Sequence, residues 1–263
     1  MRLLGVDLSA AADAGRALWV AEGFLRDDEL EVTALRPARE LPGGGVARDT
    51  ALAALVRHIP AQGECVVGID APNSLPRALV AEAWRSWLAS FPDRHPTPEH
   101  FRAACRAATG GRELRRASDV VAKTPFAPWN LRLYRQTWHA VAALYGPLVE
   151  SGAATVAPFQ PPLPGRPRLA EICPASTLKH LGLYRPYKGR AAGLAASRGA
   201  ILAAIKRATP LRLPRSLARR ALDDPGGDAL DAVIALAAAA RCQAAGLFTA
   251  HDAGHEGAVY VWA

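Results

Sequence analysis

The chain has 263 residues and a formal net charge of +8, from 32 basic and 24 acidic side chains. Because 50% of the residues are hydrophobic, the composition excludes a mainly disordered chain and allows a sizeable core. The longest apolar run, residues 232–240, is too short to span a bilayer, and the chain opens without a signal-peptide pattern, so we expect a cytoplasmic protein.

The excess of positive charge favours anionic partners, nucleic acid first. Only four of the 32 basic residues are lysines, however, so the arginines also fit a solvated surface from an arginine-rich proteome. Charge alone therefore leaves both interpretations open.

The first 70 residues predict three strands, a helix and a further strand, in that order. Apolar or alternating runs mark the strands and helical spacing marks the helix, over residues 2–7, 17–24, 29–35, 49–59 and 64–70. A turn is expected at residues 26–28, between the second and third strands.

Residues 73–165 predict a helical insertion into this strand-rich scaffold. Helices are expected over 75–90, 99–108, 112–123 and 131–150, with a loop over 91–98 and a proline-rich connector over 158–167. The remainder predicts a strand over 168–173, helices over 174–181, 191–208 and 228–243, a polar loop over 251–256 and a strand over 258–262. This order predicts one α/β domain spanning residues 1–263.

Acidic residues fall at the ends of several predicted elements. Asp7 and Asp70 end two strands, and Glu171 lies in the strand that follows the insertion. Each has an ordinary alternative role as a helix cap or turn residue. If the first and fourth strands are adjacent and parallel, however, Asp7 and Asp70 emerge at one end of the sheet, where ligands of open α/β sheets bind.

A pair of aspartates opens the last predicted helix. Asp228 and Asp231 are three residues apart and so share one helix face. Asp228 suits an N-cap, whereas Asp231 heads an apolar face and would need a partner there, for which a cation is one candidate. Carboxylate oxygens suit Mg²⁺ or Mn²⁺, and two such ions can activate water in phosphodiester hydrolysis.

The order of these motifs resembles a known family. The stretches are Gly5-Val6-Asp7, Gly68-Ile69-Asp70-Ala71-Pro72, Glu171 with Pro174, Tyr187-Lys188, Asp228-x-x-Asp231-Ala232 and Glu256-Gly257. Together they resemble the predicted ribonuclease H-like nucleases catalogued as domain of unknown function 429 (DUF429), over nearly the whole chain. The resemblance implies a mixed five-stranded sheet flanked by helices, and metal-dependent nuclease chemistry.

On this resemblance, Asp7, Asp70 and Asp231 would be the metal ligands, with Asp7 bridging two Mg²⁺ or Mn²⁺ ions. Asp228 could take the place of Asp231, and Glu171 would ligate a metal or position the attacking water. The candidate catalytic residues are therefore Asp7, Asp70, Glu171, Asp228 and Asp231.

Three basic residues are candidates for substrate binding: Arg116, Lys188 and Arg190. Arg116 could clamp a phosphate, although an ion pair with Asp119, three residues on, is the simpler interpretation. Lys188 lies beside tyrosines that could contact a base or sugar. The basic run at residues 206–220 could follow a phosphate backbone or form a solvated face.

The sequence also bears on rival functions. A sugar-kinase-like or actin-like ATPase needs glycines after the first strand, but Leu8-Ser9-Ala10 follow Asp7 here, and Pro72 removes an amide donor after Asp70. A metal-dependent nuclease is therefore the favoured prediction. A non-catalytic nucleic-acid-binding protein of the same fold and a hydrolase of small phosphoesters stay open as alternatives.

Overall fold

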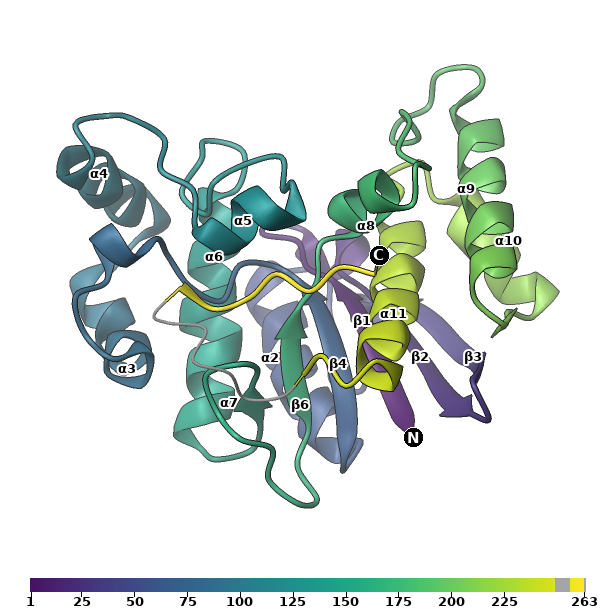
Figure 1. Cartoon of the computed structure of the whole chain (residues 1–263), viewed down its shortest axis with the longest axis horizontal. Helices are drawn as coiled ribbons and strands as arrows, with labels where there is room; N and C mark the ends of the chain where they lie inside the picture. Colours follow the sequence, from purple (N-terminus) through teal and green to yellow (C-terminus); the bar gives the residue numbers. More distant parts are fainter. Residues whose placement is uncertain (249–255, 263) are drawn as a thin grey trace.

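The protein has an α/β architecture built on a mixed seven-stranded sheet, seen in a computed structural model that describes residues 1–248 and 256–262 (Figure 1). The strand order is β5-β6-β4-β1-β2-β3-β7. The strands are β1 Arg2–Asp7, β2 Trp19–Arg26, β3 Glu29–Pro37, β4 Cys65–Asp70, β5 Thr155–Val156, β6 Arg168–Glu171 and β7 Leu211–Arg212. Most of the polar loop expected over residues 251–256 lies outside the described residues.

Strands β1 to β3 form an antiparallel meander, β4 adds in parallel beside β1, and β6 adds in parallel beside β4. The chain turns between β2 and β3 at Asp27 and Asp28, whose φ angles of 45° and 64° are left-handed, as short hairpin turns require. The prediction of five strands was wrong, because the two-residue strands β5 and β7 extend the sheet at its edges. Two residues are too few to show a periodic pattern in a sequence.

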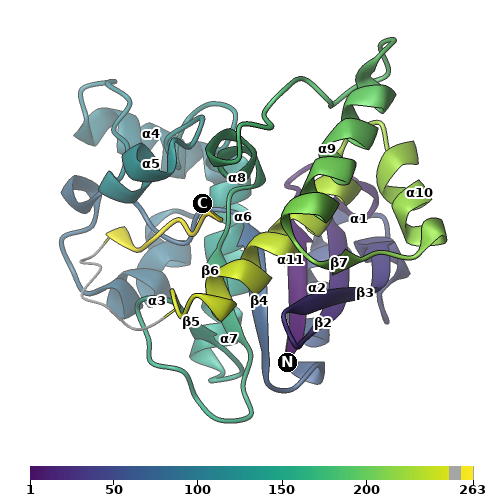
Figure 2. The same ribbon diagram turned by 45° about the vertical axis from the view of Figure 1, so that its right-hand side comes forward.

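Helices cover both faces of the sheet. Leu4 and Val6 of β1 pack on one face with α2 Arg48–Ala61 and the helical block, whereas Leu3 packs on the other with α11 Asp228–Ala244. Figure 2 shows α11 crossing its face, with α9 Leu194–Ala208 and α10 Arg215–Asp223 towards β3. No helix in the described parts of the chain is long and apolar enough to cross a membrane.

The helical block occupies the left of Figure 1, on the side of the sheet where β6 lies. Its helices are α3 Trp84–Arg94, α4 Pro98–Ala108, α5 Ala117–Ala122 and α6 Tyr134–Ala140, which continues through the π-helical η3 Val141–Tyr145 into α7 Gly146–Glu150. The short helices α1 Ala14–Ala17 and α8 Pro174–His180 and the 3₁₀ turns η1 Ala38–Glu40 and η2 Arg77–Leu79 complete the chain.

Three helix or strand predictions in these regions were wrong. The helix expected over 75–90 begins only at Trp84 and extends into the expected loop as far as Arg94. It continues past residue 90 because Phe91 packs in a T-shaped contact with Trp87 and a tilted contact with Phe101. The helix expected over 112–123 is shortened to Ala117–Ala122. The strand expected over 258–262 is reduced to one bridge, between Tyr260 and Ile172.

Two glycines let α11 lie close against the sheet. A Cβ atom on Gly5 of β1 would lie 2.2 Å from the Ala232 carbonyl oxygen and 2.3 Å from the Leu236 nitrogen. A Cβ on Gly68 of β4 would lie 3.0 Å from the Ala235 oxygen. The absence of side chains therefore brings the helix backbone onto the two strands, and with it the first turn of α11 to their carboxyl ends.

We expect Gly5→Ala to destabilise the protein by about 3 kcal/mol, the upper end of the range for overpacking, because backbone atoms cannot move aside. Gly199→Ala in α9 is the matched control, since a Cβ there meets nothing within 4 Å. That control should gain about 0.5–1 kcal/mol from helix propensity. Urea unfolding measures both, and equal midpoints for the two variants would contradict the close approach.

Candidate functional site

Three carboxylates meet at the carboxyl ends of β1 and β4. The parallel register places Asp7 opposite Asp70, and both side chains share the face on which Gly5 and Gly68 contact α11. Asp231 reaches them from the first turn of α11. Among residues 1–248 and 256–262, these three form the one group of acids, cysteines or histidines whose ligand oxygens lie within 4.8 Å of one another. We call them the carboxylate cluster.

The carboxylate cluster is an electrostatically costly arrangement. Asp7 is 6% exposed and Asp231 is 2% exposed. Burial, with Asp231 and Asp70 nearby, raises the pKa of Asp7 well above its ordinary value, although Lys188 opposes the shift. Burial and Asp231 likewise raise the pKa of Asp70 from 3.8 to about 7. Buried like charges of this kind need a counter-charge to be ionised together at neutral pH.

Lys188 and Tyr187 hold Asp231 in place. The Lys188 Nζ lies 2.7 Å from Asp231 Oδ2 and 3.3 Å from Asp228 Oδ1, and the Tyr187 hydroxyl donates to Asp231 Oδ1 at 2.6 Å. Burial alone would lower the pKa of Lys188, but Asp231, Asp7 and Asp228 raise it. Both oxygens of Asp231 therefore have a donor.

Asp228 contributes a fourth acid at the edge of the carboxylate cluster. It is the first residue of α11 rather than the N-cap, a position that Gly227 takes with a left-handed φ of 77°. Asp224 instead accepts from the backbone N–H groups of Gly226 and Ala229. The Asp228 carboxylate is thus left to pair with Lys188.

A buried arginine anchors the loop that carries Tyr187 and Lys188. The Arg198 guanidinium donates to the carbonyl of Tyr187 at 2.8 Å and to those of Leu222 at 2.9 Å and Gly189 at 3.3 Å. The sequence analysis did not identify Arg198 as a functional residue. A signal was present, because this arginine shares the buried face of the predicted helix with Ile201, Leu202 and Ile205.

Glu171 points to the opposite face of the sheet. In the parallel register it pairs with Ile69, one residue before Asp70, so the alternation of side chains directs Glu171 away from the face of Asp70. Its oxygens accept from the backbone N–H of Asn73 at 2.9 Å and from Arg116 at 2.8 and 2.5 Å. Within the described residues, Glu171 is not one of the acids of the carboxylate cluster.

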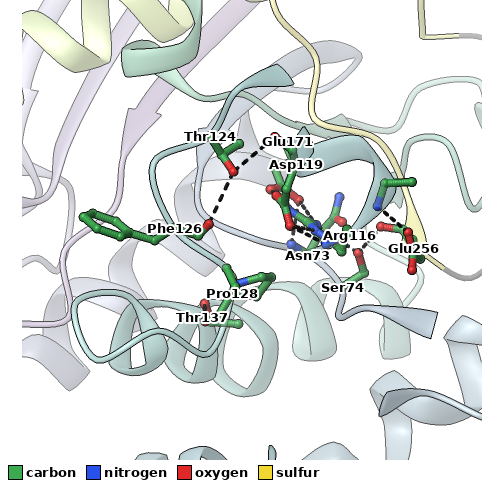
Figure 3. Close-up of polar contacts among 12 residues, drawn as sticks. Asn73, Ser74, Arg116, Asp119, Thr124, Phe126, Pro128, Thr137, Glu171 and Glu256 are labelled. Carbon is green, nitrogen blue, oxygen red and sulfur yellow. Dashed lines mark hydrogen bonds and ion pairs between the residues drawn. The ribbon is translucent and has the colours of Figure 1, made fainter. Parts of the chain in front are cut away.

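Arg116 is the centre of this second network, shown in Figure 3. It is 1% exposed and also pairs with Asp119 at 2.7 Å, the ion pair that its spacing predicts. The network is extended by Ser74, which accepts from Arg116 and donates to the backbone carbonyl of Glu256. These bonds draw Arg116 out of the expected helix and explain why α5 begins only at Ala117.

The other predicted basic groups lie apart from the carboxylate cluster. Arg190 is exposed on the loop after Lys188. In the basic run, Arg212 pairs with Glu31 of β3 at 3.6 Å and Arg220 pairs with Glu40 of η1 at 2.7 Å. The structure therefore gathers Asp7, Asp70, Asp228, Asp231 and Lys188, and leaves Glu171, Arg116 and Arg190 outside.

A polar cleft of about 530 Å³ opens beside the carboxylate cluster. Its walls include Asp7, Asp70 and Asp228 together with three basic side chains, Lys188, Arg132 and Arg135. An anion entering this cleft would meet positive charge within reach of the buried acids.

Residues 5–253 match the family described as "Protein of unknown function (DUF429)". This chain belongs to that family. The resemblance drawn from the motif order is thereby confirmed. Among solved structures, this DUF429 protein is similar to the yeast mitochondrial Holliday junction resolvase Ydc2, with a TM-score of 0.43, 11% identity and coverage of 92% of this chain and 78% of that one. None of the curated proteins matches the sequence.

Loss of the buried arginine should be far more damaging than loss of a surface one. We expect Arg116→Ala to cost about 3–5 kcal/mol, because it leaves Asp119 and Glu171 as uncompensated buried charges. Arg219 is the control: its side chain is 83% exposed beside Asp223, so Arg219→Ala should stay within about 0.5 kcal/mol of wild type. Denaturant unfolding tests this, and similar losses in both variants would refute the role of the network.

The pKa of Asp70 predicts a pH dependence of stability in metal-free protein. Since burial and Asp231 raise it from 3.8 to about 7, the folded protein retains a proton that the unfolded chain releases. The stability from that proton is complete below about pH 4 and is lost as the pH rises through about 7.

Asp70→Asn should therefore be more stable than wild type at pH 8, by about 0.5–2 kcal/mol, with the difference shrinking towards pH 4. Thermal unfolding in EDTA across this range is the measurement. Asp49→Asn, at a side chain that is 88% exposed, serves as the control and should leave the pH profile unchanged. A profile for Asp70→Asn that parallels wild type would contradict the shift.

Proposed function

We propose that this protein hydrolyses phosphodiester bonds of nucleic acid, using Mg²⁺ or Mn²⁺ held by Asp7, Asp70 and Asp231. The observation that carries the proposal is the carboxylate cluster itself: three oxygens within 4.8 Å, delivered by three separate elements of the chain. A structural role alone would favour neutral or paired side chains at such a position.

The ligand set fits a hard divalent cation. All three donors are carboxylate oxygens, the ligands that Mg²⁺ and Mn²⁺ take. With Asp228, four carboxylates face the Lys188 ammonium in the described residues, so the negative charge exceeds what this side chain balances. A divalent cation would supply the missing positive charge.

A ribonuclease H-like architecture is part of the same proposal. The meander of β1 to β3, the helix α2 and the strand β4, which returns parallel to β1, follow the order that this fold requires. Asp7 and Asp70 then lie at the end of the sheet where open α/β folds bind ligands. The support is the topology together with the family membership.

Nucleic acid is the substrate class that the surroundings favour. The chain carries a net charge of +8, and Arg132, Arg135 and Lys188 line the polar cleft beside the acids. These side chains would hold the phosphate backbone of a polyanion and make its binding dependent on salt.

In the proposed reaction a water oxygen bonds to phosphorus, the bond from phosphorus to the leaving oxygen breaks, and the proton of the water ends on the leaving alcohol. When bound by Asp7, Asp70 and Asp231, divalent ions would activate the water and stabilise the leaving oxygen. The protein holds the ligands in place: Tyr187 fixes Asp231, and Arg198 fixes the loop of Tyr187 and Lys188. Lys188 supplies positive charge beside the phosphate.

The test combines metal binding with cleavage. Asp7→Asn should abolish Mn²⁺ binding in calorimetry and reduce cleavage of single-stranded, duplex and branched DNA and RNA by at least about 100-fold, because losses of 10–100-fold are typical even of outer-sphere residues. The exposed control Asp49→Asn should keep both properties. Metal-dependent cleavage that survives in Asp7→Asn would refute the assignment. Salt-sensitive binding without cleavage by wild type would identify a non-catalytic binding protein instead.

A further inference from the structure

A mainly apolar pocket of about 510 Å³ adjoins the polar cleft and shares Asp70 with it as a wall. Its apolar walls include Pro125, Phe126, Leu133, Ala175, Pro186 and Tyr187, and the buried Arg116, Asp119 and Glu171 also line it. Asp70, Asp231 and Lys188 also line it, so the pocket opens directly onto the carboxylate cluster.

The pocket and the polar cleft are continuous. Asp70, Arg132, Gln136 and Lys188 line both of them. Gln136 is held at this junction because its amide donates to the backbone carbonyl of Asp70 at 2.5 Å. A ligand that spans the junction would therefore have a polar, cationic surface on one side of the acids and an apolar surface on the other.

One nucleotide has this division of chemistry, with an anionic phosphate next to a flat aromatic base. We propose that the apolar pocket holds an unpaired nucleobase of the polynucleotide whose phosphodiester lies at the carboxylate cluster. The inference rests on the proposed function and specifies its substrate: a single strand, or a site in a duplex where a base is unpaired.

The side chains of the pocket suit a base. Phe126, Tyr184 and Tyr187 supply aromatic surface, and the Arg132 guanidinium lies 5.4 Å from the centre of the Phe126 ring. Bases stack on aromatic rings and on guanidinium planes regardless of their identity. Arg185, which also lines the pocket, adds positive charge that an uncharged apolar ligand would leave unused.

The size of the pocket limits the occupant. Pockets of about 300–1,000 Å³ enclose one small organic molecule, and a base with its sugar is of that class. A base pair within a continuous helix, with both of its backbones, is too large for a pocket of this volume. A base must therefore leave its stack to enter, which an unpaired base does at the least cost.

The experiment compares two decamers with equal charge: oligothymidylate, and the same sugar–phosphate chain without bases. Binding is measured by the anisotropy of an end label in Ca²⁺. Wild type should bind oligothymidylate about tenfold more tightly than the abasic chain, the magnitude of base–aromatic stacking. Ala175→Trp, which fills the pocket, should bring this ratio close to one without changing the affinity for the abasic chain.

The matched control is Ala104→Trp, at a half-buried alanine on α4 that is not a wall of the pocket. It should keep the tenfold ratio. An affinity ratio that is unchanged in Ala175→Trp would overturn the proposal. An equal loss of affinity for both decamers would also overturn it, because the pocket would then bind the sugar–phosphate backbone rather than a base. A blunt-ended duplex of two complementary strands, with every base paired, would also overturn it if its binding were sensitive to Ala175→Trp.

A measurement on wild type guards against a variant that fails to fold. Oligonucleotides with 5-iodouracil should crosslink to Phe126, Tyr184 or Tyr187 on irradiation, and crosslinks confined to other regions would refute the pocket as the base site. The two proposals fail separately. If wild type cleaves nothing, but Ala175→Trp still lowers the ratio of the affinities for oligothymidylate and the abasic decamer, hydrolysis alone is refuted. If wild type cleaves nucleic acid, but Ala175→Trp leaves this affinity ratio unchanged, the base pocket alone is refuted.

Discussion

The close packing of α11 on β1 and β4 is the constraint on which the carboxylate cluster depends. Gly5 and Gly68 remove the side chains that would hold the helix away, so its backbone rests on the strands. Asp231 precedes Ala232, one of the residues in that contact, and is thereby fixed next to Asp7 and Asp70. The proposed metal site therefore depends on Gly5 and Gly68, although neither residue has a side chain.

The pleat of the sheet divides the buried acids into two systems. Glu171 lies on one face with Asp119, where the fork of Arg116 and a backbone N–H satisfy its oxygens. Asp7, Asp70 and Asp231 lie on the other face, with the Lys188 ammonium beside them. The first system is closed and holds the helical block to the sheet. The second has fewer positive partners and lines the polar cleft, as the proposed metal site requires.

The helical block completes the site that the sheet begins. Arg132, just before α6, and Gln136, in its first turn, lie where the polar cleft meets the apolar pocket, and Phe126 contributes to the pocket wall. The acids thus come from the sheet and α11, whereas much of the surface that would recognise a substrate comes from the insertion. If the proposed function holds, anchoring of the helical block by the Arg116 network would bear on substrate specificity as well as stability.

The sequence by itself determined the strands that end at Asp7 and Asp70, the helix that opens with Asp228, and the family. Local periodicity and motif order carry that information, because a buried strand or an amphipathic helix is specified by its own residues. The helices around Trp84 and Arg116 were misplaced, since aromatic packing and buried ion pairs with distant residues override local propensity there.

Only the tertiary structure decided which acids meet. The register between β4 and β6 sets Glu171 opposite Ile69, and this one-residue offset sends its side chain to the other face from Asp70. The burial of Arg116, the anchoring by Arg198 and the pairing of Tyr187 with Asp231 likewise join residues far apart in the chain. Periodicity along one strand fixes the alternation of its side chains, but the phase between two strands is set by packing across the whole sheet.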